Sequence, residues 1–134
     1  MFVDANVIID ILNNDEVWGD WSIAKLQECS ASHDLVINPI IYAELAARYA
    51  TAEELDKMME GIELEIVDLP KEAAFLAGKA FAQYRKSGGT KTNVLSDFFI
   101  GAHAKVVGVP ILTRDVRRYR RYFPDVPLIA PTAQ

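Results

Sequence analysis

Residues 1–10 read MFVDANVIID, in which one carboxylate, Asp4, stands between the apolar pair Phe2–Val3 and a second apolar run. The apolar pair favours a short strand over residues 1–4, and residues 5–13 have helical periodicity with Asp4 as the natural N-cap. A carboxylate flanked by apolar runs is partly buried, and an unpaired buried charge is costly. Asp4 therefore needs a partner elsewhere in the chain.

Strands and helices alternate along the rest of the sequence. Continuous Val/Ile/Leu runs predict four more strands, at residues 34–38, 63–69, 109–113 and 126–129. Periodicity and capping residues predict helices at residues 16–30, 39–49, 51–60, 71–86, 94–107 and 114–123. This alternation is typical of a parallel sheet covered on both faces. We therefore expect an α/β fold with a central parallel sheet of about four to five strands and helices on both faces.

Composition indicates an ordinary soluble protein. The 134 residues suit one domain over residues 1–134, and 51% of them are hydrophobic while 25% are charged. One cysteine and two histidines, His33 and His103, exclude an internal disulfide and a Cys/His zinc cluster. We expect Cys29 to be a small buried hydrophobe. No signal-peptide pattern and no run of membrane-spanning length is present, so we expect a cytoplasmic protein with no membrane partner.

Three further acidic residues stand in unusual places. Asp115 follows a predicted strand that ends in Thr113, and in a parallel sheet this strand end shares a rim with Asp4. Glu44 is three and four residues from two isoleucines, so helical geometry places it on their apolar face. Asp97 lies between two apolar stretches at the start of a predicted helix. All four acids map to strand ends or to helices that begin there.

Each position has a simpler explanation when it is considered alone. Asp4 and Asp115 are suitable N-caps, which stabilise a helix by ~1 kcal/mol. Asp97 is a favourable first-turn acid, and Glu44 is spaced to pair with Arg48. These explanations do not account for the convergence of four acids.

Convergent carboxylates need a counter-ion. Two carboxylates ~4 Å apart repel by ~4 kcal/mol at an effective dielectric constant of ~20. A divalent cation removes this penalty, and oxygen ligands without cysteine or histidine select a hard ion, Mg²⁺ or Mn²⁺.

Four stretches carry a resemblance to a known family. They are FVDANVIID (2–10), IIYAEL (40–45), VLSDFFIGAHA (94–104) and VPILTRDVRRYRRYFPDVPLIAP (109–131). In this order they span essentially the whole chain and resemble the PIN domain, and more closely the VapC-type ribonuclease toxins of VapBC toxin–antitoxin modules. Each motif alone is weak, because D-x-N and T-R-D occur by chance, but the ordered set is specific.

The resemblance implies a set of site residues. The four acidic positions of the family fall on Asp4, Glu44, Asp97 and Asp115. We expect Asp4 and Asp97 to bind metal directly, Asp115 to act through water, and Glu44 to ligate the metal or orient the attacking water. Asn6 and Thr113 match polar residues that orient the carboxylates or waters.

The resemblance also implies an activity and partners. The expected activity is a Mg²⁺-dependent endoribonuclease, with Mn²⁺ as the alternative ion, that hydrolyses tRNA, rRNA or mRNA through a metal-activated water. The products would be a 3′ hydroxyl and a 5′ phosphate. The expected partners are a second copy of the chain, in a homodimer, and a VapB-type antitoxin that blocks the acidic site within a larger toxin–antitoxin complex.

The stretch RDVRRYRR (114–121) concentrates positive charge in a chain whose net charge is −5. Four of its arginines have the i, i+3, i+4, i+7 spacing of one helix face. They are Arg114, Arg117, Arg118 and Arg121. With Tyr119 and Tyr122 interleaved, this face suits phosphate binding and stacking on single-stranded bases. A solvated helix face that balances an acidic protein explains the arginines equally well.

A glycine-containing loop at residues 87–93 follows the helix at 71–86. Lys86, Lys91 and Thr92, in and next to this loop, are weaker candidates for substrate contact.

Three other functions fit parts of the pattern. A phosphoryl-accepting receiver domain needs adjacent acids after the first strand and a lysine after the last strand, and neither is present. A DNA-directed nuclease would use the same metal site, because that site contacts phosphate and does not sense the 2′ hydroxyl. A PIN-like module that binds RNA or protein without cutting would be marked by loss of one of the four acids, and all four are present.

Overall fold

The computed structural model describes residues 1–91 and 94–132, so Thr92 lies outside the described residues. One sheet of five parallel strands has the order β3-β2-β1-β4-β5. The strands are β1 (Phe2–Val3), β2 (Leu35–Ile37), β3 (Leu64–Ile66), β4 (Ile111–Leu112) and β5 (Leu128–Ile129). The predicted α/β fold with a parallel sheet is confirmed, although each strand is shorter than the apolar run that predicts it.

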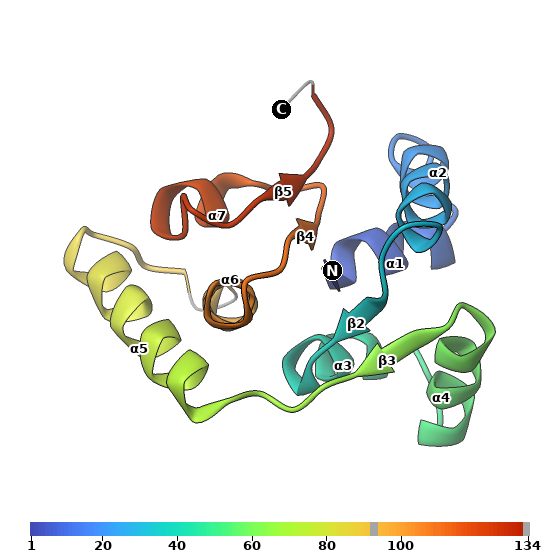
Figure 1. Ribbon diagram of the computed structural model, residues 1–134, viewed down its shortest axis with the longest axis horizontal. Coiled ribbons are helices and arrows are strands. Elements are labelled where there is room, and N and C mark those ends of the chain that lie inside the picture. Colours follow the sequence, from blue (N-terminus) through green and yellow to red (C-terminus); the bar gives the residue numbers. More distant parts are fainter. Residues whose placement is uncertain (92–93, 133–134) are drawn as a thin grey trace.

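Helices surround this sheet. Those in the described residues are α1 (Ala5–Leu12), α2 (Gly19–Ser30), α3 (Pro39–Ala46), α4 (Ala52–Gly61), α5 (Lys71–Lys86), α6 (Leu95–Val107) and α7 (Arg117–Tyr122). Figure 1 shows α1 and α2 on one side of the line of strands, with α5, α6 and α7 on the other side. Helices therefore cover both faces, as the sequence predicts. None of the helices in residues 1–91 and 94–132 is both long and apolar enough to cross a membrane.

Two helices begin later than the sequence predicts, for local reasons. The start of α2 moves from residue 16 to Gly19 because the Asp15 carboxylate accepts hydrogen bonds from the backbone N–H groups of Val17 (2.9 Å) and Trp18 (2.8 Å). These bonds hold a turn ahead of the helix. The start of α7 moves from residue 114 to Arg117. Thr113 and Arg114 instead donate hydrogen bonds to Asp4 and Asn6, at the end of β1 and the start of α1.

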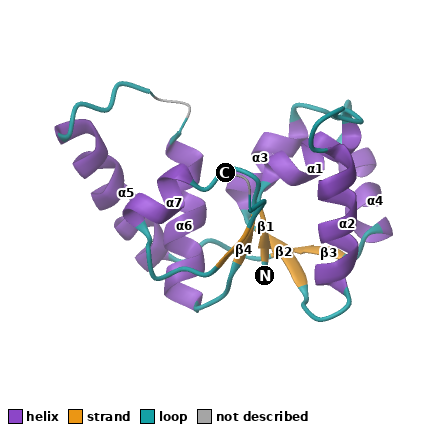
Figure 2. Cartoon of the chain, turned by 90° about the horizontal axis from the view of Figure 1, so that it is seen from above, coloured by secondary structure: helices purple, strands orange, loops and turns teal. Residues whose placement is uncertain are grey.

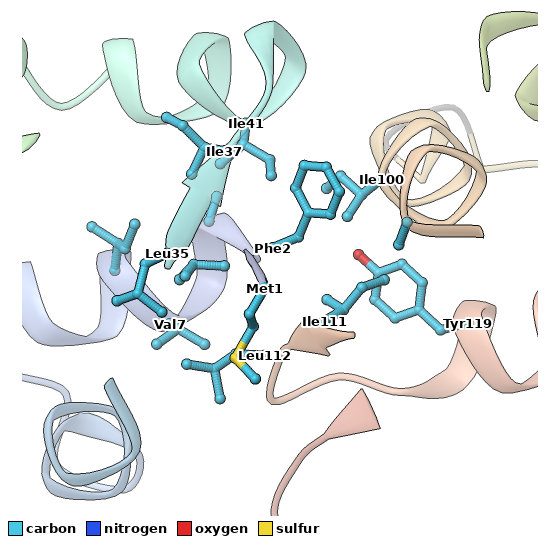
Figure 3. Close-up of a cluster of buried hydrophobic side chains, with 14 of the residues drawn as sticks. Met1, Phe2, Val7, Leu35, Ile37, Ile41, Ile100, Ile111, Leu112 and Tyr119 are labelled. Atoms are coloured by element: carbon cyan, nitrogen blue, oxygen red, sulfur yellow. The ribbon is translucent and has the colours of Figure 1, made fainter. Parts of the chain in front are cut away.

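The core lies where β1 and β4 pair. Phe2 and Ile111, neighbours in the register of these strands, are 1% and 0% exposed. Figure 3 shows them among Ile37, Ile41 and Ile100, which come from β2, α3 and α6. Burial on both faces holds the two central strands rigidly, so the residues that follow them are placed accurately.

The strand order creates a switch point between β1 and β4. The chain adds β2 and β3 on one side of β1, and then returns to add β4 and β5 on the other side. In open α/β sheets, ligand sites form beyond the carboxyl ends of strands at such a reversal. Figure 2 shows the strands between the group of α5, α6 and α7 and the group of α1 to α4. The topology therefore directs attention to Asp4 after β1 and to residues 113–115 after β4.

Candidate active site

The ends of β1 and β4 bring Asp4 beside Thr113. Val3 pairs with Leu112, and the backbone N–H of Asp4 donates to the Leu112 carbonyl at 2.9 Å. The ladder thus extends one residue past each strand. The two side chains leave the sheet next to each other, although they are 109 residues apart in sequence.

Asp4 is fixed by two hydroxyl donors. Its residue is 5% exposed, and its Oδ2 accepts hydrogen bonds from Thr113 Oγ1 (2.9 Å) and Tyr119 Oη (2.7 Å). Figure 3 shows the Tyr119 ring beside Ile111 with its hydroxyl oxygen directed away from α7. Asp4 occupies the N-cap position of α1, but its carboxylate makes no capping hydrogen bond. The Asp4 carboxylate therefore bonds Thr113 and Tyr119 at the edge of the sheet and does not cap the helix.

Burial raises the pKa of Asp4, and the hydrogen bonds from Tyr119 and Thr113 oppose this effect. Burial also raises the pKa of Tyr119 well above its usual value, so this hydroxyl keeps its proton and remains a donor.

Thr113 connects Asp4 to the loop before α7. Its hydroxyl accepts hydrogen bonds from Asn6 Nδ2 (3.2 Å) and from the backbone N–H of Asp115 (3.1 Å). Its single proton is then available for Asp4. The Oδ1 of Asn6 accepts from the backbone N–H of Arg114 at 3.2 Å. Asn6 and Thr113 therefore hold Asp4 and the 113–115 loop together through hydrogen bonds.

Asp97 and Glu44 approach this rim from α6 and α3. Burial is the largest cause of the raised pKa of Asp97, about 7, and the charges of Asp4, Glu44 and Asp115 raise it further. The pKa of Glu44 is also raised to about 7, first by partial desolvation of its carboxyl group and then by the charge of Asp4. Each of the four acids therefore influences the pKa of at least one other, so the fold places them within electrostatic range of each other.

One expectation about Glu44 is wrong. It does not share the buried face of α3, because Ile41 and Leu45 are buried while Glu44 is exposed. The proposed pairing with Arg48 is also absent from the described residues, where Arg48 donates to Asn13 Oδ1 instead. Glu44 thus keeps a solvent-accessible carboxylate near a buried one, which suits contact with a ligand.

Asp115 differs from the other three acids. The guanidinium of Arg117 donates to both of its oxygens, with Nε to Oδ1 at 3.0 Å and Nη2 to Oδ2 at 2.9 Å. These bonds hold the pKa of Asp115 below its usual range. A carboxylate already engaged on both oxygens is better placed to bind an ion through water than directly.

We call Asp4, Glu44, Asp97 and Asp115 the acidic centre. As they stand, no three acidic, histidine or cysteine side chains in residues 1–91 and 94–132 are grouped closely enough to hold one ion. Their chemistry nevertheless fits a hard cation, since all the donors are oxygens and two pKa values are raised to about 7 by burial and by mutual repulsion. A bound cation would relieve that repulsion.

Two residues of the site were not predicted from the sequence. Tyr119 was expected to stack on bases, but it is 1% exposed and instead holds Asp4. Asp10 is 3% exposed and pairs with Arg114 through Arg114 Nε and Nη2, the latter 3.2 Å from Asp10 Oδ1. The pair ties α1 to the 113–115 loop. The only sequence signal for Asp10 was its place in an apolar run, as for Asp4.

The expected arginine face is only partly correct. Arg114 precedes α7 and is held by Asp10, so it does not share a helix face with the others. Arg117 is paired with Asp115. Arg118 and Arg121 form no hydrogen bond or ion pair with a described residue. The side chain of Lys91 likewise shows no such partner, although its backbone N–H donates to Tyr84 Oη at 3.2 Å.

The remaining polar and aromatic residues have structural explanations. His103 is 2% exposed, and its Nδ1 accepts from Asn38 Nδ2 at 3.1 Å, while Asn38 Oδ1 caps α3. Cys29 is buried, as expected, and burial raises the pKa of its thiol. Trp18 and Trp21 pack edge to face, and each is only half-buried.

Comparisons with known proteins agree with the fold described above. The PIN domain family model matches residues 1–124, and the chain belongs to this family. No curated protein gives a significant match in sequence.

Solved structures share the fold at low sequence identity. VapBC2 from Rickettsia felis, bound to a DNA fragment from its promoter, has a TM-score of 0.72 and 20% identity, and the match covers 97% of each chain. VapBC-1 from nontypeable Haemophilus influenzae has a TM-score of 0.71 and 21% identity, over 96% of each chain. A toxin–antitoxin complex from Klebsiella pneumoniae has a TM-score of 0.60 and 20% identity, over 93% of each chain.

Proposed function

We propose that this protein is a divalent-metal-dependent endoribonuclease that acts as the toxin of a toxin–antitoxin pair. The observation that carries the proposal is the convergence of four carboxylates at the switch point of a PIN-domain sheet. Burial, and then repulsion from Asp4, Glu44 and Asp115, raises the pKa of Asp97 to about 7, and a perturbed carboxyl pKa of this kind supports a functional site that binds a cation.

In this proposal, Asp4 and Asp97 bind Mg²⁺ or Mn²⁺ directly, while Asp115 contributes through water. When bound, the cation supplies an activated water and neutralises charge that develops on the phosphate.

The chain's own residues set the geometry. Thr113 and Tyr119 hold the Asp4 carboxylate in one orientation through its Oδ2. Asn6 fixes Thr113 and the backbone of Arg114. Asp4 and the 113–115 loop are therefore oriented before substrate arrives.

Hydrolysis then proceeds in line at the phosphorus. The water oxygen forms a bond to phosphorus as the bond to the 3′ oxygen breaks, and the 3′ oxygen takes up a proton. The exposed carboxylate of Glu44, whose pKa is about 7, is suited to accept the proton that the attacking water loses. The products are a 3′ hydroxyl and a 5′ phosphate on tRNA, rRNA or mRNA.

The proposed partners rest on the structural neighbours. Several are VapBC complexes, and one is described as a toxin–antitoxin complex. We propose a VapB-type antitoxin that covers the acidic centre, a homodimeric toxin, and a cytoplasmic location where RNA is available.

Two other functions use the same fold. A DNA-directed nuclease would have the same acidic centre, and a non-cutting binding module would have the same surface. Retention of all four acids favours an enzyme over the binding module.

The test uses the antitoxin-free protein on a pool of structured cellular RNAs and, in parallel, on single-stranded and duplex DNA. Each reaction is run with Mg²⁺, with EDTA, and with the Asp97→Asn variant. We expect discrete RNA fragments with 5′ phosphates only when Mg²⁺ and Asp97 are both present. The matched control is Asp20→Asn, which makes the same change at an exposed position of α2 and should leave cleavage unchanged.

Each alternative has its own outcome. Cleavage of DNA in preference to RNA would reassign the substrate. Mg²⁺ binding without cleavage of any nucleic acid would indicate the binding module. Cleavage that persists in EDTA would contradict the metal site.

A further inference from the structure

Two adjoining hollows lie between α5 and α7. One has a volume of about 340 Å³ and is lined by Tyr84, Arg117, Arg118, Arg121 and Tyr122. The other has a volume of about 250 Å³, and its polar lining includes Lys79, Gln83 and Lys105. Arg121 and Tyr122 line both hollows, so the two adjoin, and we call them together the α5–α7 groove. Figures 1 and 2 both show α5 and α7 on the same side of the strands.

The groove is basic although the protein is acidic overall. Three arginines and two lysines line it, and no carboxylate is among its lining residues in the described chain. The net charge of the whole chain is −5. Such local concentration of positive charge is the electrostatic footprint of a polyanion site.

Two of the guanidinium groups lack acceptors. The Nε of Arg118 is buried and has no hydrogen-bond partner in the described chain. A buried donor without an acceptor costs free energy, which an anionic ligand would recover. Arg121 lies 5.6 Å from the centre of the Tyr122 ring, with no carboxylate paired to it in the described residues. Arg117, in contrast, is already neutralised by Asp115.

The aromatic walls are held in place. Tyr84 and Tyr122 meet edge to face with ring centres 6.3 Å apart. The backbone at Gly89 lies against the Tyr84 ring so closely that an added Cβ would stand 2.4 Å from ring carbon Cζ. The backbone N–H of Lys91 also donates to Tyr84 Oη. Because Gly89 and Phe81 pack against the Tyr84 ring, Tyr84 serves to hold Tyr122 in place. The Tyr122 ring, with Arg121 beside it, suits a nucleobase of any identity.

The groove begins at the acidic centre. Arg117 bonds Asp115, and the charge of Arg118 lowers the pKa of both Asp97 and Asp115. The first hollow is therefore next to Asp115 of the acidic centre, and the second adjoins the first.

We propose that the α5–α7 groove holds the single-stranded RNA that leads into the acidic centre, with Arg118 and Arg121 on phosphates, Tyr122 against a base and Lys79 on the next phosphate. Lys105, which also lines the groove, is ion-paired with Asp125 at 3.7 Å. This proposal rests on the proposed ribonuclease function and adds the path of the substrate strand. Phosphate and stacking contacts make the groove tolerant of sequence.

The test measures binding and cleavage separately. Binding of a labelled single-stranded RNA of ~10 nucleotides is measured in EDTA on the full-length Asp97→Asn protein, over a range of salt concentrations. We expect Lys79→Gln/Arg121→Gln to weaken this binding by about 10- to 30-fold and to reduce the salt slope by about 1.4, since each single-strand phosphate contact contributes about 0.7. The matched control, Lys25→Gln/Lys57→Gln, removes the same charge from α2 and α4 and should bind as the parent does.

In the protein with Asp97 intact, the same double substitution should raise KM and leave kcat nearly unchanged. Circular dichroism of each variant confirms folding, and Tyr122→Ala, which keeps every charge, provides a second independent probe. We expect this variant to weaken single-stranded RNA binding while the salt slope stays the same.

Other outcomes separate the two proposals. Equal RNA binding by the groove variant and the control, with cleavage intact, would overturn the groove and leave the nuclease standing. Groove-dependent binding without any cleavage by the protein with Asp97 intact would support the groove and contradict the nuclease. Tighter binding of poly-glutamate than of RNA would assign the groove to an acidic segment of a protein partner and overturn this proposal.

Discussion

The carboxyl group of Asp97 keeps its proton to a pH at which an ordinary aspartate has lost it. Its pKa is raised to about 7 by burial and then by the charges of Asp4, Glu44 and Asp115. In the unfolded chain the same group titrates near pH ~4. Between these values the unfolded state binds fewer protons than the folded state, so the free energy of unfolding falls as pH rises towards about 7.

The Asp97→Asn variant should remove this contribution. In EDTA, we expect the free energy of unfolding of the variant, relative to the natural chain, to rise by about 1–2 kcal/mol between pH 4.5 and pH 8, after allowance for partial solvent screening. Urea unfolding at the two pH values measures the difference. The Asp20→Asn control should show no such change with pH. A difference that stays constant, or decreases, would show that folding does not raise the pKa of Asp97.

Tyr119 acts on Asp4 through a single buried hydroxyl, which makes it a positioning residue. Tyr119→Phe should leave the fold intact and cost about 1 kcal/mol of stability. We expect Mg²⁺ affinity and kcat to fall by about 10-fold, because the Asp4 carboxylate loses one of its two hydroxyl donors. Tyr49→Phe is the control, since the described structure shows no hydrogen bond to the Tyr49 hydroxyl. Equal Mg²⁺ affinity in the two variants would contradict the positioning role.

At the scale of elements, α6 reaches its place because Gly101 allows close packing against Phe123. A Cβ on Gly101 would stand 2.3 Å from the Phe123 ring. Asp97 lies one turn earlier on the same helix. The contact between α6 and the end of α7 therefore sets the position of one acid of the centre.

A pair of glycine substitutions tests this contact. Gly101→Ala should destabilise the protein by about 1–3 kcal/mol, because the buried ring has to move. Gly78→Ala, in the exposed middle of α5 with open space around it, should stabilise by about 0.5–1 kcal/mol. Thermal unfolding of both variants gives the comparison. Similar effects at the two positions would show that the α6–α7 packing is not tight.

The elements were predictable from the sequence where local patterns determine them. Alternating apolar runs and caps locate all five strands and the parallel fold, and Thr51 caps α4 as its motif predicts. The end of α3 at Ala46 and the start of α7 at Arg117 were not predictable by the same means. The start of α7 depends on hydrogen bonds that Arg114 donates to Asn6 and Asp10, which are more than 100 residues away in sequence. Such non-local pairs leave no periodic signal.

The candidate site shows the same division. The four acids and their polar helpers, Asn6 and Thr113, were found from apolar context together with the family resemblance. Tyr119 was misinterpreted because its spacing among arginines is equally typical of a solvent-facing residue, and only the fold shows that it is 1% exposed. Glu44 was predicted on the wrong face of α3, because apolar residues in a helix of eight residues do not define the direction of the buried face to better than half a turn.

For the whole molecule, acidic and basic regions are adjacent and complementary. The acidic centre lies at the switch point of the sheet, and the basic groove between α5 and α7 begins beside it. In the proposal, the groove attracts phosphates towards a site that repels anions until a cation is bound. The proposal therefore predicts that metal binding, proton release and substrate entry are coupled.

The most direct test of the metal site is the number of protons released when Mg²⁺ binds. Titration calorimetry at pH 7, in two buffers with different ionisation enthalpies, measures this number for the natural chain and for Asp97→Asn. With the pKa values of Asp97 and Glu44 both about 7, each carboxyl is about half protonated at this pH.

We therefore predict release of about one proton per bound ion at pH 7, more at pH 6 and almost none at pH 9, with much weaker binding by Asp97→Asn. Binding without proton release at pH 7, or no binding at all, would contradict the central claim that these four carboxylates form a cation site.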